Sequence, residues 1–143
     1  MIKPLEKKKK KPNIAALRRK ADRLYQELGR EMYKNCFCGK PYSCLHHHHT
    51  KGRSSALRYE IKNGVPICQG CHNQHHRASD VDIEFRYKLY MEDKWGKDWE
   101  IELRQQRFAN KDLKTNVAWY KANIEMLEEQ IKAYKDETNK DNF

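Results

Sequence analysis

The chain has 143 residues, of which 35% are charged and 38% belong to the hydrophobic set, so it can bury one small core. No stretch approaches the roughly 18 apolar residues of a membrane-spanning helix, and no charged-then-apolar leader opens the sequence. This composition argues against a membrane protein and a secretory precursor. The five cysteines are expected in a reducing cytosol, where close pairs bind metal more often than they form disulfides.

The net charge of +10 is unevenly distributed. Residues 1–35 carry +8, residues 36–77 carry +5 and residues 78–143 carry −3. This asymmetry predicts a polyanionic partner on one side of the molecule, with nucleic acid as the first candidate and an anionic membrane surface as the second. The membrane is less favoured because no strongly amphipathic basic helix with a Trp/Phe face accompanies the charge.

The first two segments are a basic arm and a basic helix. Residues 1–12 contain lysines that either contact phosphates or form a solvated tail: Lys7, Lys8, Lys9, Lys10 and Lys11. Residues 13–35 are expected to form a helix capped by Asn13, and Gly29 allows a break because glycine costs about 1 kcal/mol in a helix interior. Helical spacing predicts a buried stripe: Leu17, Ala21, Leu24 and Leu28. The other faces carry basic residues that can follow a nucleic-acid backbone: Arg18, Arg19, Lys20 and Arg23.

The middle of the chain differs from its flanks. Residues 36–79 contain all five cysteines and all seven histidines, which predicts a small core that carries a site. Extended segments are expected at 43–49 and 65–67, followed by a helix over 69–79. Residues 80–110 are predicted to add a helical extension.

The last segment, residues 111–143, carries apolar residues at alternating spacings of 4 and 3 over about three heptads. The seam consists of Leu113, Val117, Tyr120, Ile124, Leu127, Ile131 and Tyr134. It is expected either to pack back on the domain or to pair with a second chain as a homodimer. A seam of this length is short for a stable dimer, so a homodimer would need further contacts.

Two close cysteine pairs predict a structural zinc ion. Cys68 and Cys71 form a CxxC pair, and Cys36 and Cys38 form a CxC pair. Thiolates bind Zn²⁺ tetrahedrally, and a loop-rich segment gains stability from such a site. Because the first pair is CxC, Cys44 competes for one ligand position. The alternative is a set of ordinary thiols.

The seven histidines fall within residues 46–76. Four are consecutive at 46–49, and the others share one face of the predicted helix: His72, His75 and His76. Side chains alternate faces along a strand, so one histidine can ligate a metal while its neighbour points across the strand to a substrate. Neutral imidazole binds divalent transition metals, and a pKa near about 6.5 suits a general base. A catalytic metal site is therefore predicted here.

The core contains an adjacent histidine pair, a central asparagine and a CxxC that precedes two histidines: His48, His49, Asn63, Cys68, Cys71, His72 and His76. In order and spacing this set resembles the HNH, or ββα-metal, endonucleases. Weaker matches over roughly residues 14–104 are similar to the phage NinG/Rap recombination endonucleases: residues 17–24, 50–53, 56–59 and 86–96. The resemblance implies a phage-encoded protein in the cytoplasm of a bacterial host.

The resemblance also implies a role for each matched residue. His48 would be the first ligand of a catalytic divalent ion (Mg²⁺, Mn²⁺, Ni²⁺ or Zn²⁺). His49 would be the general base that takes a proton from the attacking water, and Asn63 would fix the loop that orients His49. The remaining ligands would come from the helix: His72, with His76 or less readily His75 as a third. The four-sulfur zinc of the family maps to the two cysteine pairs.

The sequence therefore predicts an α+β, mostly helical protein with a small zinc-stabilised ββα-metal (HNH) core and flanking helices. Its predicted activity is the hydrolysis of phosphodiester bonds in double-stranded or branched DNA, such as Holliday junctions, leaving 5′-phosphate ends. Basic residues near the site would hold flanking phosphates: Lys51, Arg53 and Arg58. The alternatives are a non-catalytic zinc-dependent DNA-binding module, a metal-buffering or interaction protein, and a nuclease specific for RNA.

Overall fold

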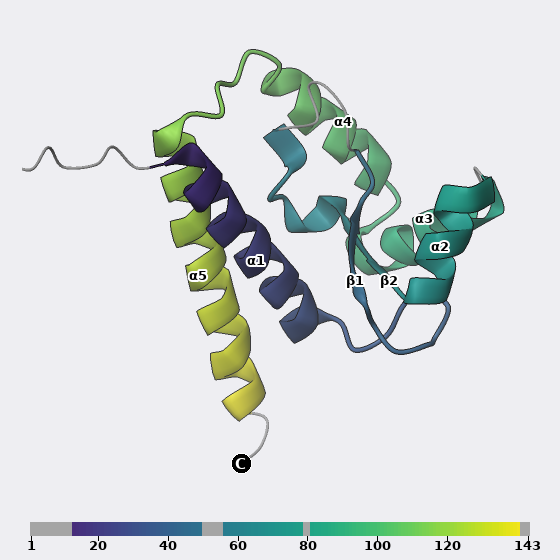
Figure 1. Cartoon of the computed structure of the whole chain (residues 1–143). Coiled ribbons are helices and arrows are strands. Elements are labelled where there is room, and N and C mark those ends of the chain that lie inside the picture. Colours follow the sequence, from purple (N-terminus) through teal and green to yellow (C-terminus); the bar gives the residue numbers. More distant parts are fainter. Residues whose placement is uncertain (1–12, 50–55, 79–80, 141–143) are drawn as a thin grey trace, which may run out of the picture.

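The computed structural model describes residues 13–49, 56–78 and 81–140. The chain is mostly helical with one small antiparallel sheet, which agrees with the predicted α+β class (Figure 1). Its elements are α1 (Ile14–Met32), β1 (Cys44–His47), the 3₁₀ helix η2 (Ile61–Asn63), β2 (Gly64–Ile67), α2 (Gln69–Ala78), α3 (Val81–Trp95), α4 (Trp99–Ala109) and α5 (Val117–Lys140). Within these ranges, no helix has the length and apolar character needed to cross a membrane.

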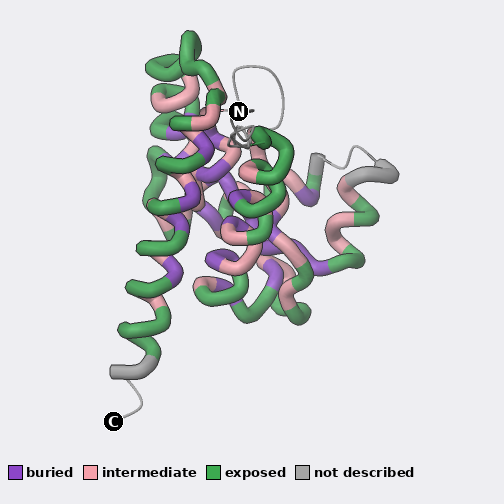
Figure 2. The backbone as a smooth tube through the Cα atoms, turned by 60° about the vertical axis from the view of Figure 1, so that its left-hand side comes forward, coloured by how far each residue is buried: buried purple, intermediate pink, exposed green. Residues whose placement is uncertain are grey.

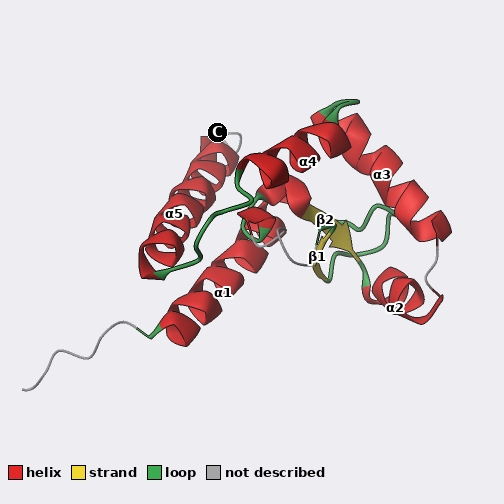
Figure 3. Ribbon diagram, turned by 90° about the horizontal axis from the view of Figure 1, so that it is seen from above, coloured by secondary structure: helices red, strands yellow, loops and turns green. Residues whose placement is uncertain are grey.

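The sheet is a two-stranded hairpin at the centre of the molecule. Its register runs from the Cys44–Ile67 pair to the His47–Gly64 pair. α1 and α5 lie on one side of the hairpin, and α2 and α3 lie on the other (Figure 3). Leu45 of β1 joins the core formed with α1 and α5, whereas Val65 of β2 joins the core formed with α3 and α4. The hairpin therefore connects two hydrophobic clusters.

The predicted heptad seam packs back on the domain, against α1. Its central residues are buried in the α1–α5 core: Tyr120, Ile124, Leu127 and Ile131. They face the stripe predicted for α1, and Figure 2 shows the buried positions recurring along one side of α5. Leu113 precedes α5 and is exposed. The structure therefore has the first of the two expected arrangements, and a homodimer through this helix stays a prediction.

α1 continues through Gly29 without a break and ends at the cap residue Tyr33. Gly29 is needed for close packing, because a Cβ atom there would lie 2.6 Å from Leu45 Cγ and 2.6 Å from the Tyr42 hydroxyl. The helix tolerates the glycine because it lets β1 approach the helix backbone directly. At the other end, the Asn13 side chain accepts a hydrogen bond from the Ala15 N–H, so the predicted cap is confirmed.

We expect Gly29→Ala to lower the free energy of unfolding. Overpacking of this kind costs about 1–3 kcal/mol, which outweighs the gain of about 1 kcal/mol in helix propensity. The matched control is Gly70→Ala in α2, where the nearest atom to an added Cβ is Cys68 Sγ at 4.0 Å. Urea denaturation should show a loss for the first variant and none for the control. Equal stability of the two variants would contradict the packing argument.

Candidate metal centre and active site

Four cysteine sulfurs converge beside the hairpin. The Sγ atoms of Cys36, Cys38, Cys68 and Cys71 all lie within 4.8 Å of one another, and those of Cys38 and Cys68 are 3.7 Å apart. Zn–S bonds of about 2.3 Å in a tetrahedron separate the sulfurs by about 3.8 Å. The four residues can therefore hold a structural metal ion such as zinc. Cys44 lies in β1, outside this group, so the arrangement favours Cys36 as the ligand.

Two tight backbone turns present these sulfurs. In the first, the Cys36 N–H donates to the Lys40 carbonyl (2.7 Å) and the Gly39 N–H donates to the Cys36 carbonyl (2.9 Å). Gly39 has a φ of 92°, in the left-handed region that glycine adopts at low cost. In the second turn, the Cys71 N–H donates to Cys68 Sγ (3.4 Å) at the start of α2.

The thiols of this cluster differ in acidity because their surroundings differ. Burial raises the pKa of Cys36 to about 11. Burial also opposes ionisation of Cys68, but hydrogen bonds from the Cys71 backbone and the neighbouring thiols outweigh it and lower its pKa to about 7. Burial and the Cys68 sulfur raise the pKa of Cys71. A divalent cation would therefore displace protons on binding, which makes its affinity dependent on pH.

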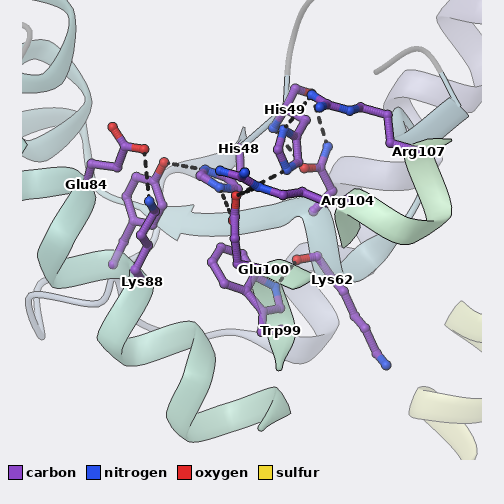
Figure 4. A network of polar contacts seen from close by, with 11 residues as sticks. His48, His49, Lys62, Glu84, Lys88, Trp99, Glu100, Arg104 and Arg107 are labelled. Atoms are coloured by element: carbon purple, nitrogen blue, oxygen red, sulfur yellow. Dashed lines mark hydrogen bonds and ion pairs between the residues drawn. The ribbon is translucent and has the colours of Figure 1, made fainter. Parts of the chain in front are cut away.

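A second group of potential ligands joins the loop after β1 to α4. One ligand atom from each of His48, His49 and Glu100 lies within 4.8 Å of the others. His48 Nε2 contacts Glu100 Oε2, and His48 Nδ1 is 2.6 Å from the Tyr87 hydroxyl (Figure 4). His49 Nε2 is 3.7 Å from Glu100 Oε1. Both imidazoles therefore approach the same carboxylate.

The Asn63 side chain holds the backbone of His49. Its Oδ1 accepts from the His49 N–H (2.9 Å), and its Nδ2 donates to the carbonyls of His49 (3.3 Å) and Leu57 (3.2 Å). Asn63 is fully buried, so its amide needs these partners in place of water. The geometry agrees with the loop-fixing role that the resemblance implies for Asn63, whereas the role of His49 as a base stays a prediction.

The side chains of the four consecutive histidines at 46–49 do not alternate between the two faces of the strand along the whole run. His47, the last residue of β1, points toward α1, where its ring stacks on Tyr25 (5.1 Å) and its Nε2 is 2.9 Å from the Arg58 carbonyl. His48 and His49 lie beyond the strand, and their ring centroids are 4.6 Å apart. The expectation that these two imidazoles point in opposite directions is therefore wrong, because strand geometry ends one residue before them.

The histidines of α2 are found beside a different residue of the run. The His46 ring centroid lies 5.7 Å from that of His72 and 4.8 Å from that of His75. His72 is outside the group formed around Glu100, and the side chain of His76 lies outside the described residues. A shared ion between His48 and His72 therefore stays a prediction.

Sequence reasoning missed the contribution of α4. Trp99, its fully buried first residue, stacks on His48 with ring centroids 5.0 Å apart and donates from Nε1 to the Lys62 carbonyl (2.6 Å). These contacts anchor the start of α4 beside the histidines. Glu100 follows Trp99 directly, so its carboxylate is placed by the same anchor.

Two arginines of α4 extend this side of the site. Arg104 donates from Nε to Glu100 Oε1 (2.9 Å), and an Arg107 guanidinium nitrogen is 3.4 Å from His49 Nδ1. Glu100, Arg104 and Arg107 recur at i, i+4 and i+7, the spacing of one helix face. This spacing is visible in the sequence and places the three side chains on one helix face, but it matches no metal-binding motif.

The ionisation states at the site follow from burial and neighbours. Burial lowers the pKa of His48 and of His49, although Glu100 opposes both shifts. Burial raises the pKa of Glu100, but the Arg104 hydrogen bond and the His48 contacts outweigh it, and the net shift is downward. At neutral pH the site therefore combines neutral imidazoles with an ionised carboxylate, which suits cation binding and proton abstraction.

The predicted phosphate-binding residues have different environments. Arg58 pairs with Asp22 through two hydrogen bonds of 3.0 and 2.9 Å, so its charge is already compensated within the fold. Arg18 donates to the Tyr120 hydroxyl (3.0 Å), and Arg19 is exposed on α1. The remaining predicted contacts lie outside the described residues: Lys7, Lys8, Lys9, Lys10, Lys11, Lys51 and Arg53.

Comparisons of the chain with protein-family models, with curated proteins and with solved structures found no match.

We expect the purified protein to contain about one tightly bound zinc ion per chain. Cys68→Ser should lose this ion and much of its stability, because Cys68 is in the sulfur cluster, whereas Cys44→Ser should retain both. Elemental analysis and thermal unfolding with and without a chelator measure the two effects. A folded, zinc-free wild-type protein would contradict the assignment, as would zinc loss in the Cys44 variant alone.

Proposed function

We propose that this protein is a metal-dependent DNA endonuclease with an HNH (ββα-metal) core that leaves 5′-phosphate ends. The observation that carries the proposal is the double hydrogen bond between the Asn63 side chain and the His49 backbone. It gives the adjacent pair His48–His49 a fixed geometry at the mouth of the hairpin. A general base needs such fixing, because proton transfer depends on hydrogen-bond distance to the reacting water.

His49 suits the role of general base. Its Nε2 is buried and has no hydrogen-bond partner among the described residues, and it lies 3.7 Å from Glu100 Oε1. Arginine can only donate, so the contact of Arg107 with His49 Nδ1 (3.4 Å) places the proton of the neutral imidazole on Nε2, toward Glu100. Because burial lowers the pKa of His49, the neutral form is favoured at neutral pH, and its Nδ1 lone pair can take a proton from a water molecule. A bound divalent ion would supply a Lewis acid for the scissile phosphate.

The surroundings of His49 suit a polyanionic substrate. Arg104 and Arg107 lie beside it on α4, and the net charge of the chain is +10. Guanidinium groups bind phosphate oxygens with two parallel hydrogen bonds. Next to these arginines, Ile101 and Phe108 are exposed and line the same hollow. Arginines beside an exposed aromatic ring suit DNA whose bases are partly unstacked, which supports branched DNA as the substrate.

We expect His49→Ala to reduce DNA nicking by about 100-fold or more, the usual contribution of a general base. DNA binding should be retained, because the arginines of α4 and the basic N-terminal segment are unchanged. The assay compares plasmid, linear and four-way-junction DNA, with a matched RNA, in Mg²⁺, Mn²⁺ or Ni²⁺. Zinc content and thermal unfolding of the variant serve as controls for folding.

Two outcomes would contradict this proposal. Undiminished cleavage by a folded His49→Ala protein would remove the base assignment. Salt-dependent DNA binding by the wild type without cleavage in any metal would instead favour the second candidate, a non-catalytic zinc-dependent DNA-binding module. The four-cysteine cluster fits this binding module as well as it fits the nuclease, because a zinc-dependent binding module needs no catalytic histidine.

A further inference from the structure

We propose that Glu100 of α4 and His48 together bind the divalent cation of this site, so that α4 is part of the active centre. The inference rests on the proposed function for the role of the cation in cleavage. The binding claim itself can be tested without DNA.

The contacts of His48 fit a metal ligand. Its Nδ1 is 2.6 Å from the Tyr87 hydroxyl, and its Nε2 faces Glu100 Oε2. Histidine ligands usually engage their second ring nitrogen with a partner that fixes the tautomer. When Nδ1 carries the proton, Nε2 presents a lone pair to the carboxylate. In this tautomer Nε2 and Glu100 Oε2 can bind one cation together, in place of the hydrogen bond that the Nε2–H tautomer makes to the carboxylate.

The Glu100 carboxylate is oriented by its neighbours. Its Oε1 accepts from Arg104 Nε (2.9 Å), while its Oε2 remains directed at His48 (Figure 4). The side chain is 19% exposed, so one side of the carboxylate stays open to water and substrate. Trp99 holds the preceding residue against His48 and the Lys62 carbonyl. The pair is therefore preorganised by contacts that need no cation.

The ligand types indicate which cation binds. A single imidazole with a single carboxylate leaves most coordination positions to water and phosphate oxygens, which is the usual arrangement for Mg²⁺ and Mn²⁺. The alternative set of His48, His72 and His76 offers imidazoles alone, which suit Ni²⁺ or Zn²⁺ better. Metal preference consequently distinguishes the two ligand sets.

The test is a titration of Mn²⁺ into the zinc-loaded full-length protein, followed by calorimetry and by the electron paramagnetic resonance signal of free Mn²⁺. We expect Glu100→Gln to weaken Mn²⁺ binding at least tenfold, because the amide loses the ligand charge while retaining the shape. Glu102→Gln is the matched control, because Glu102 lies on the same helix, is exposed and pairs only loosely with Lys62 (3.8 Å). It should bind Mn²⁺ like the wild type.

Each outcome bears on a separate claim. Wild-type Mn²⁺ affinity in Glu100→Gln overturns the inference, and loss of binding in His72→Ala alone would then assign the ion to α2 and leave the nuclease proposal intact. Loss of Mn²⁺ binding in Glu100→Gln without DNA cleavage by the wild type supports Glu100 as a ligand and contradicts the nuclease. Should Glu100→Gln unfold, Glu100→Ala also removes the carboxylate, and wild-type affinity in that variant would overturn the inference.

Discussion

The hold of Asn63 on the His49 backbone is the interaction on which the candidate site depends. β1 ends at His47, and a backbone hydrogen bond from the His48 N–H to the Asn63 carbonyl (2.9 Å) extends the pairing by one residue. At His49 the buried Asn63 side chain takes the place of strand pairing, since it bonds to both backbone polar groups of His49 and to the Leu57 carbonyl. Leaving such buried groups unpaired would cost about 1–3 kcal/mol each. Asparagine meets this need because one side chain supplies both an acceptor and two donors.

The four-cysteine cluster has a complementary structural role. It connects the turn before β1 to the start of α2, while the adjacent hydrophobic cluster is small, with Cys36, Ile67 and Cys68 as its buried members. The larger cores lie elsewhere, between α1 and α5 and among α3, α4 and β2. A bound ion would therefore stabilise the part of the described chain whose hydrophobic cluster is small. It would also fix α2 relative to the hairpin.

Local patterns predicted the features that depend on local chemistry. The cap at Asn13, the stripe of α1, the hairpin segments and the four converging cysteines follow from spacing and side-chain type. Tertiary packing determined what the patterns missed. Gly29 suggested a possible helix break because the sequence does not show that Leu45 packs closely against this position. Arg58 was predicted to bind phosphate because the sequence does not show that it pairs with Asp22. The directions of the histidine side chains depend on the residue at which β1 ends, and sequence propensity does not locate a strand end to within one residue.

Glu100 could not be inferred from the histidine motif because it enters the site from a separate helix. The 3₁₀ helix η2 connects the two parts. Its residue Asn63 fixes His49 through the side chain, and the preceding residue Lys62 accepts the Trp99 hydrogen bond through its carbonyl. One short turn therefore positions both the histidine loop and the start of α4. Since Glu100 directly follows Trp99, η2 contributes to the placement of both the imidazoles and the carboxylate. A site assembled in this way can be preorganised before any cation or DNA binds, because its two parts are held by hydrogen bonds to the same short helix.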